Sequence, residues 1–403
     1  MSVNLKEGDD TGILETTVKK LRVGVIYGGR SGEHEVSVAS AASIMRHLDR
    51  HRYDPVPIRI EKSGRWSLAD KVPTAISAAD VLEHARADGG RLARGREAHL
   101  VAYPSEEAML TIERPGSGDA RDGDQQAIVT GLGLDVIFPV LHGPYGEDGS
   151  VQGLLELANV PYVGAGVLGS AVGMDKAVMK VLFAARGLPV APYLVYLRHE
   201  WQRDAGAATQ VERTLGFPVF VKPANLGSSV GISKAKTPQE LADAVTLAFS
   251  FDRKVVIEAA VPQAREIECA VLGNDDPEAS VAGEIVPSRE FYDYEAKYLD
   301  EGSKLLIPAP LSPLETENIR RLAIEAFRAV EGAGMSRVDF LVDGTNGKVF
   351  LNEVNTIPGF TTISMYPKLW EASGLGYAAL IDRLIVLALE RHAAKQQLKT
   401  SIT

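Results

Sequence analysis

The stretch Ser336–Ser364 constrains the fold more than any other part of this sequence, because its two halves are expected to pair with each other. Val338–Val342 and Lys348–Asn355 have the pattern of strands, and Asp-Gly and Asn-Gly pairs lie between them. These features predict a β-hairpin. We expect Leu341 to lie opposite Leu351, and this pair sets the register of the others.

The same register would bring two carboxylates together. It places Asp339 opposite Glu353 and Arg337 opposite Asn355, all on one face of the hairpin. Like charges directly opposite each other destabilise a sheet, but a divalent cation would turn this repulsion into attraction. Two carboxylates and an amide oxygen are hard donors that suit Mg²⁺ holding phosphates. The alternative is a solvated face whose carboxylates are neutralised by Arg337 or Lys348.

The segment after the hairpin, Asn355–Thr362, favours a binding site over a solvated face. It leaves the strand through the Pro358-Gly359 turn, where the backbone can expose N–H groups to a ligand. We therefore expect a ligand beside the paired carboxylates.

Composition indicates an ordinary soluble protein of two or three domains, with 403 residues, 45% hydrophobic and 24% charged. The single cysteine, Cys269, excludes an internal disulfide and is expected to be a buried core thiol. The first twenty residues lack the apolar segment of a signal peptide, so we expect a frayed tail. No apolar run approaches the ~20 residues of a membrane span. A net charge of −10 gives no general attraction for nucleic acid, so we expect a cytoplasmic protein with neither a membrane nor a nucleic-acid partner.

Near the N-terminus, two strand–glycine turn–helix units follow each other. Val23–Tyr27 precedes a Gly-rich turn and a helix over Glu35–Leu48, and Asp135–Leu141 precedes a Gly-rich loop and a helix near Ser150–Ala158. Alternating strands and helices predict a parallel sheet with its loops at the carboxyl ends of the strands.

Two stretches predict no regular element. Residues 71–130 include a polar, Gly-rich part and are expected to form a loop or insertion. Gly164–Gly169 matches G-x-G-x-x-G, but no acidic residue closes a second strand ~20 positions later, as a dinucleotide site requires. We favour a flexible turn between domains.

A helix is expected from Asp175-Lys176 to Leu182, stopped by Gly187-Leu188-Pro189.

The middle of the chain carries a candidate phosphate loop. Phe217–Pro223 is a predicted strand that contains Lys222, and the Gly/Ser loop Gly227–Ile232 follows it. Backbone N–H groups of such a loop can bind phosphates while Lys222 adds charge, although an ordinary hairpin with an exposed lysine has the same pattern. Glu258, at the end of the strand Lys254–Ile257, could accept hydrogen bonds from adenine or ribose, and an exposed glutamate is the alternative.

Taken together, the motifs resemble those of the D-alanine–D-alanine ligases of the ATP-grasp superfamily, from about Val23 to about Leu389. In chain order they are GGRSGEHEVS, LHGPYGEDGSVQG, GMDK, VKPANLGSSVG, REIE, FYDYEAKY, SRVDF and NEVNTIPGFTTISMYP. The resemblance implies an α/β, three-domain ATP-grasp fold, with an N-terminal parallel-sheet domain and with ATP held between the central and C-terminal domains. The implied boundaries are 1–20 for a flexible tail, 21–164 for the N-terminal α/β substrate-binding domain, 165–261 for the central ATP-grasp subdomain, 262–395 for the C-terminal ATP-grasp catalytic domain and 396–403 for a second tail.

The resemblance also implies an activity. Two molecules of D-alanine would be joined to D-alanyl-D-alanine for peptidoglycan, with ATP cleaved to ADP and phosphate and with D-alanyl phosphate as the intermediate. The implied cofactor ion is Mg²⁺, for which Mn²⁺ can substitute. A homodimer is the implied assembly.

Family roles carried over position by position fall into four sets. The implied nucleotide contacts are Lys176, Lys222, Ser229, Glu258 and Glu266. The implied magnesium ligands are Asp339, Glu353 and Asn355. The implied catalytic residues are Glu33 for the ammonium of the first D-alanine, Ser228 and Tyr298 for the link from Glu33 to a mobile loop, and Arg337 and the N–H of Gly359 for the tetrahedral intermediate. The implied contacts to the substrates are His142, Lys297, Ser364 and Met365, with Lys297 and Ser364 near the carboxylate of the second D-alanine.

Other activities stay open. A D-alanine–D-lactate or D-alanine–D-serine ligase would share most of these motifs, and Met365 stands where many relatives have leucine. The loop Phe291–Tyr298 looks like that of dipeptide ligases, which favours a peptide product. An inactive nucleotide-binding regulator would be expected to have lost a metal ligand or Arg337, and this sequence keeps them all.

Overall fold

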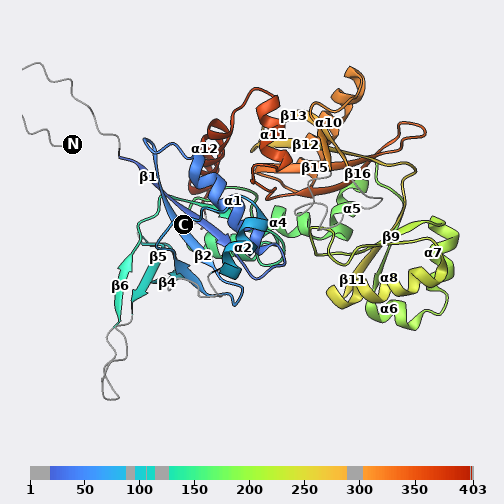
Figure 1. The fold of residues 1–403 in the computed structure, drawn as a ribbon, viewed down its shortest axis with the longest axis horizontal. Coiled ribbons are helices and arrows are strands. Elements are labelled where there is room, and N and C mark those ends of the chain that lie inside the picture. The colour runs from blue at the N-terminus through green and yellow to red at the C-terminus, as the bar shows by residue number, and fades with distance from the viewer. Residues whose placement is uncertain are drawn as a thin grey trace, which may run out of the picture.

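Three β-sheets follow one another along the chain, each flanked by helices (Figure 1). The computed structural model describes residues 19–87, 96–105, 107–113, 127–287, 303–399 and 401. The expected N-terminal tail over 1–20 therefore lies almost wholly outside the described residues. Among the described residues, no single helix has the length and apolar composition to cross a membrane. The helices α11 (Met365–Ala372) and α12 (Tyr377–Gln396) meet both criteria only when taken together, and this pair is bent by 104°.

The first sheet has seven strands in the order β6-β5-β4-β3-β2-β1-β7. Its strands are β1 (Leu21–Gly28), β2 (Tyr53–Ile60), β3 (Trp66–Leu68), β4 (Arg96–Leu100), β5 (Met109–Glu113), β6 (Ile128–Gly131) and β7 (Val136–Val140), with α1 (His34–His47), α2 (Ala78–Ala87) and α3 (Ser150–Leu157) beside them. Only β1, β2 and β7 are parallel, so the expected parallel sheet is in fact mixed.

The expectation of a loop or insertion over 71–130 is wrong for most of the described part of that segment. It contains α2 and the antiparallel strands β4, β5 and β6, which extend the first sheet (Figure 1). Ala98, Met109 and Thr111 alternate with more exposed neighbours, as on a sheet with one buried face. Each strand is at most five residues long, too short for periodicity to show clearly within a polar segment.

The glycine motif Gly164–Gly169 is half turn and half helix, which corrects the expected flexible turn. Gly164 has a φ of +96°, but α4 (Val167–Met174) begins inside the motif. A Cβ at Gly169 would lie 2.4 Å from the carbonyl oxygen of Glu331. The later glycine therefore allows the helix to pack closely on the backbone at Glu331.

The second sheet, β10-β9-β11-β8, is antiparallel. Its strands are β8 (Tyr193–Leu197), β9 (Val219–Pro223), β10 (Ser233–Ala235) and β11 (Lys254–Ala259), and its helices are α6 (Arg198–Arg203), α7 (Ala207–Leu215) and α8 (Pro238–Phe251). The helix α5 (Lys176–Ala185) precedes this sheet. It begins at Lys176 because the Asp175 side chain accepts hydrogen bonds from the N–H groups of Ala177 and Val178.

The third sheet, β14-β13-β12-β15-β16, is also antiparallel. It comprises β12 (Arg265–Gly273), β13 (Glu278–Val286), β14 (Lys304–Leu306), β15 (Gly334–Val342) and β16 (Val349–Asn355), with α10 (Pro313–Ala329), α11 (Met365–Ala372) and α12 (Tyr377–Gln396). Cys269 on β12 is a buried free thiol, as expected.

The last helix, α12, returns to the first sheet. In Figure 1 it lies beside α1, and its buried residues Leu380 and Leu384 share one hydrophobic core with Val25 and Val136 of β1 and β7. Burial of apolar surface between the ends of the chain holds the first and third sheets together. The segment between β16 and α12, which includes α11, is thus held at both of its ends.

Candidate active site

The predicted hairpin is formed by β15 and β16, and its polar pairs are confirmed. They are Asp339 with Glu353 and Arg337 with Asn355. The expected apolar pair is wrong, because Leu351 lies opposite Phe340 rather than Leu341. A bulge next to Asp339 shifts the register by one residue and leaves Asn352 as the additional residue of β16. The Oδ1 of Asn352 accepts a hydrogen bond of 3.1 Å from Lys222, so the bulge directs this side chain to the second sheet.

A third carboxylate extends the pair into a row. Glu268 on β12 lies opposite Asp339 on the other side of β15. Arg337 partly offsets these charges: its Nε and Nη2 each donate a 2.7 Å hydrogen bond to Asp339, and its Nε lies 3.1 Å from Glu268 Oε2. In the sequence Glu268 is only the last residue of the motif REIE, and the pairing of β12 with β15 reveals its neighbours.

The oxygen donors of this row fit a magnesium ion by their chemistry. Asp339 and Glu353 are adjacent, and the Asn355 side chain lies 3.0 Å from Asp339. Across the described ranges, no three His, Cys, Asp or Glu side chains are arranged as a finished metal site. Asp339 would therefore exchange its bidentate contact with Arg337 for the ion, and Glu268 would still bind the guanidinium.

On the second sheet, a buried carboxylate pairs with two lysines. Glu258 Oε2 lies 2.7 Å from Lys222 Nζ, and its Oε1 lies 2.9 Å from Lys180 Nζ. Burial alone would raise the pKa of Glu258, but the two ammonium groups outweigh it and hold this pKa at about 2. The pKa of Lys222 is raised despite burial, mainly by Glu258 and with help from the charge of Glu266.

Lys180 was missed by the sequence reasoning. It is 1% exposed and lies one helical turn after Lys176 on α5, so both lysines face the interior. Desolvation lowers the pKa of Lys180. Lys176 donates a 2.7 Å hydrogen bond to the carbonyl of Leu226 and lies 3.3 Å from Glu353, so α5 connects the phosphate loop to the carboxylate row. The i, i+4 spacing was the available signal.

Two serines of the Gly/Ser loop have an uncommon backbone conformation. Ser228 and Ser229 have φ values of 51° and 59°, in the left-handed region that non-glycine residues rarely adopt. The hydroxyl of Ser228 donates a hydrogen bond to Glu33 Oε1, as the sequence comparison implied. A Cβ at Gly227 would lie 2.9 Å from Glu33 Oε2, and one at Gly143 would lie 2.8 Å from it. Both positions therefore need glycine for the carboxylate to fit between the first and second sheets.

Two groups beside Glu33, the buried His142 and the half-buried Glu147, bind the segment after β16. The Nδ1 of His142 lies 3.0 Å from the carbonyl of Ile357, and desolvation lowers the pKa of this imidazole. Glu147 accepts hydrogen bonds from the N–H groups of Gly143 (2.7 Å) and Ile357 (3.2 Å). Burial, and then the charge of Glu33, raises the pKa of Glu147 to about 8. Glu147 was not among the expected site residues.

The turn after β16 leaves no room for a side chain at Gly359. A Cβ at Gly359 would come 2.9 Å from Ser364 Oγ, and that Oγ accepts a 3.0 Å hydrogen bond from the N–H of Thr361. Met365 is buried and packs against β13, where a Cβ at Gly283 would lie 2.4 Å from its Cε. The expected Gly359 and Ser364 thus lie in one turn, and Met365 begins α11 directly after it.

Most of the expected site residues gather where the three sheets meet, and two cannot be placed. Glu266 lies on β12, opposite Leu341 and Ile285, near enough to Lys222 for its charge to act. Lys297 and Tyr298, and the whole loop Phe291–Tyr298, lie outside the described residues.

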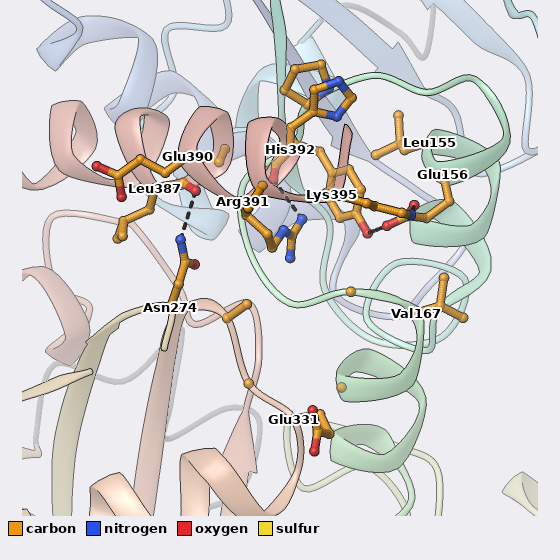
Figure 2. Close-up of a pocket in the computed structure, with 18 of the residues that line it drawn as sticks. Leu155, Glu156, Val167, Asn274, Glu331, Leu387, Glu390, Arg391, His392 and Lys395 are labelled. Carbon is orange, nitrogen blue, oxygen red and sulfur yellow. Dashed lines mark hydrogen bonds and ion pairs between the residues drawn. The ribbon is translucent and has the colours of Figure 1, made fainter. Parts of the chain in front are cut away.

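A cavity of about 750 Å³ lies elsewhere, between α3, α4 and α12 (Figure 2). Its polar groups largely serve the junction itself: Asn274 donates a 3.0 Å hydrogen bond to the carbonyl of Leu387, Arg391 donates one of 3.0 Å to the carbonyl of Tyr162, and Lys395 pairs with Glu156. None of the expected site residues lines this cavity. The carboxylate row is therefore the candidate active site.

Family models and curated relatives agree on the identity of the chain. Residues 22–165 match the model described as D-ala D-ala ligase N-terminus, and residues 182–386 match D-ala D-ala ligase C-terminus. The D-alanine--D-alanine ligase of Heliobacterium modesticaldum is 49% identical over 94% of this chain and 97% of its own length. D-alanine--D-alanine ligase A of Escherichia coli is 47% identical over 96% of this chain and 100% of its own length.

Solved structures agree with the fold. The D-alanine-D-alanine ligase from Coxiella burnetii matches with a TM-score of 0.75 at 38% identity, covering 94% of this chain and 97% of that one. The VanG D-Ala:D-Ser ligase from Enterococcus faecalis matches with a TM-score of 0.76 at 33% identity, covering 92% and 100%. The expected α/β ATP-grasp fold is confirmed. The chain belongs to the D-alanine–D-alanine ligase family.

Proposed function

We propose that this protein joins two D-alanines to D-alanyl-D-alanine with ATP as the energy source, for peptidoglycan precursors. The observation that supports this most strongly is the row Glu268, Asp339 and Glu353, with Arg337 bound to its middle member, at the junction of the sheets. The ligase role of this row is inferred from the relationship of the chain to the D-alanine–D-alanine ligases.

ATP would lie between the second and third sheets. Glu258 and Glu266 would accept hydrogen bonds from adenine and ribose, while Lys176, Lys222 and the Gly/Ser loop with Ser229 would bind phosphates. The magnesium ligands would be Asp339, Glu353 and Asn355. Mg²⁺ at this position would neutralise the charge that moves onto the leaving ADP, and Mn²⁺ has the same preference for oxygen donors.

The first step joins the first D-alanine to the γ-phosphoryl group. Glu33 would bind the ammonium of this D-alanine, while a carboxylate oxygen attacks the γ-phosphorus and ADP leaves. Ser228 holds Glu33 through its hydroxyl, so the carboxylate has a fixed position. His142 and Glu147 would support the same pocket through their contacts with Ile357.

The second step forms the peptide. The amine of the second D-alanine attacks the acyl carbon, and phosphate leaves with the oxygen that bridged carbon and phosphorus. Arg337 and the N–H of Gly359 would stabilise the oxyanion of the tetrahedral intermediate. Ser364 and Lys297 would bind the second carboxylate, Met365 would pack beside it, and Tyr298 would close the site with Ser228 and Glu33.

A second candidate is a ligase for D-serine, which the similarity to VanG supports. The test offers D-alanine together with D-serine or D-lactate, with ATP and Mg²⁺, and analyses products by mass spectrometry and phosphate release. We expect D-alanyl-D-alanine to predominate. Predominant D-alanyl-D-serine or D-alanyl-D-lactate would reassign the second substrate, and absence of D-alanine-dependent phosphate release would overturn the ligase proposal.

Two further proposals rest on the family relationship. We expect a homodimer in solution, which sedimentation or light scattering would test. The expected location is the cytoplasm.

A further inference from the structure

Both backbone polar groups of Phe360 are held by side chains from distant helices. The N–H of Phe360 donates a 3.2 Å hydrogen bond to Ser40 Oγ on α1, and its carbonyl accepts one of 2.5 Å from the Tyr377 hydroxyl on α12. The Tyr377 hydroxyl also lies 3.1 Å from Ser43 Oγ. A phenol has one proton, so Ser43 donates to Tyr377 while Tyr377 donates to Phe360. We call Ser40 and Tyr377 the Phe360 anchors.

The ring of Phe360 leaves little freedom for the residue to turn. Phe360 is fully buried, and its ring lies 5.4 Å from that of Tyr366 and 6.1 Å from that of Tyr377. Phe138 of β7 approaches it edge-on at 6.0 Å. The ring therefore fixes where Phe360 lies, and the anchors fix the orientation of its peptide groups.

That orientation matters for the residue before it. Gly359 has no Cβ, so its own φ and ψ are weakly restricted. The peptide unit between Gly359 and Phe360 is planar, and Ser40 holds it by the Phe360 N–H. The next unit is held by Tyr377 through the Phe360 carbonyl. Without these bonds the Gly359 backbone could rotate, and its N–H would lose a fixed direction.

We propose that Ser40 and Tyr377 are positioning residues that aim the Gly359 N–H at the oxyanion of the ligase reaction. This inference rests on the function proposed above. Ser40 Oγ also lies 3.4 Å from His142 Nε2, so the same contact joins the turn to the pocket of the first substrate. The anchors lie on α1 and α12, outside the family motifs of the turn itself.

The test compares two tyrosines. Tyr377→Phe removes only the hydroxyl and keeps the ring. Tyr366→Phe is the matched control, because Tyr366 is also buried, also packs on Phe360 and donates a 3.1 Å hydrogen bond to a carbonyl outside the turn, that of Val271. We expect kcat for Tyr377→Phe to fall about tenfold with KM for ATP unchanged, the loss of one neutral hydrogen bond. Tyr366→Phe should lower Tm and leave kcat near wild type.

Wild-type kcat in Tyr377→Phe, or an equal kcat loss in both variants, would overturn the proposal. Amide hydrogen exchange supplies a second measurement that needs no activity: exchange across Gly359–Thr361 should be faster in Tyr377→Phe than in Tyr366→Phe. If wild type lacks ligase activity, the proposed function fails while exchange still reports on the anchors. If Tyr377→Phe does not fold, Ser40→Ala is measured in its place, with the same two expected results and the same contrary outcomes.

Discussion

Arg337 has two carboxylate partners that would separate during catalysis. The bidentate pair of Arg337 with Asp339 uses both carboxylate oxygens that a metal would need. The contact of Arg337 with Glu268 uses none of the proposed metal ligands. Glu268 could therefore still hold the guanidinium if Asp339 bound an ion. A charge-assisted contact of this kind is stronger than a neutral hydrogen bond.

Glu147 predicts a pH dependence of stability. Its pKa in the folded protein is raised from 4.5 to about 8, so the folded state binds this proton more tightly than the unfolded chain does. The contribution of Glu147 to stability is complete below about pH 4.5 and is lost as pH rises through about 8. Glu33 adds to this shift, and Lys176 opposes it.

Thermal unfolding of wild type and Glu147→Gln between pH 4.5 and 8.5 measures this effect. We expect Tm of wild type to fall more steeply with rising pH than Tm of the variant, since glutamine cannot ionise. Glu83→Gln, at an exposed position of α2, is the control and should follow wild type. Parallel curves for wild type and Glu147→Gln would show that Glu147 is already ionised in the folded protein.

At the scale of elements, α5 carries two buried lysines, Lys176 and Lys180, toward the proposed nucleotide site. Lys180, Lys222 and Glu258 form a group with two positive charges and one negative charge. Lys180→Met would leave the balanced pair Lys222–Glu258, so we expect little loss of Tm. Glu258 would then lose one of the two lysines that orient its carboxylate and would hold Lys222 more tightly. We therefore expect KM for ATP to rise about tenfold, the effect of losing one charge-assisted hydrogen bond.

Lys254→Met is the matched control for this prediction. Lys254 pairs with Asp175, the residue that caps α5, and not with Glu258. Its loss should lower Tm without changing KM for ATP. A Lys180→Met enzyme with wild-type KM for ATP would show that Lys180 serves packing alone.

The elements also show what the sequence could predict. The Asp339–Glu353 pair was predicted from turn residues and alternation, but the bulge beyond it was not. The buried residues Leu351 and Val354 are three positions apart, so alternation fails between them, whereas the expected register assumed that it continued unbroken. Strands β4 to β6 were too short to predict. Lys180 and Glu268 were missed since their importance comes from burial and from neighbours far away in sequence. Glu147 was missed because its partner Ile357 lies far away in sequence.

At the scale of the whole molecule, three sheets contribute different parts of one site. The first sheet brings Glu33 and His142, the second brings Lys222 and Glu258, and the third brings the carboxylate row. Helix α12 packs on the first sheet and anchors the turn of the third (Figure 1). Sequence pattern alone predicted Lys222, Glu258 and the paired carboxylates of the hairpin, whereas Glu33 and His142 came only from the resemblance to a family.

Isotope transfer tests most directly whether this site makes an acyl phosphate. D-alanine labelled with ¹⁸O in its carboxylate is incubated with ATP, Mg²⁺ and the protein, and the released phosphate is analysed by mass spectrometry. The carboxylate oxygen that attacks the γ-phosphorus leaves with phosphate, so we expect one labelled oxygen in phosphate for each dipeptide formed. Dipeptide formation with unlabelled phosphate would contradict an acyl phosphate intermediate at the Arg337–Asp339–Glu353 site.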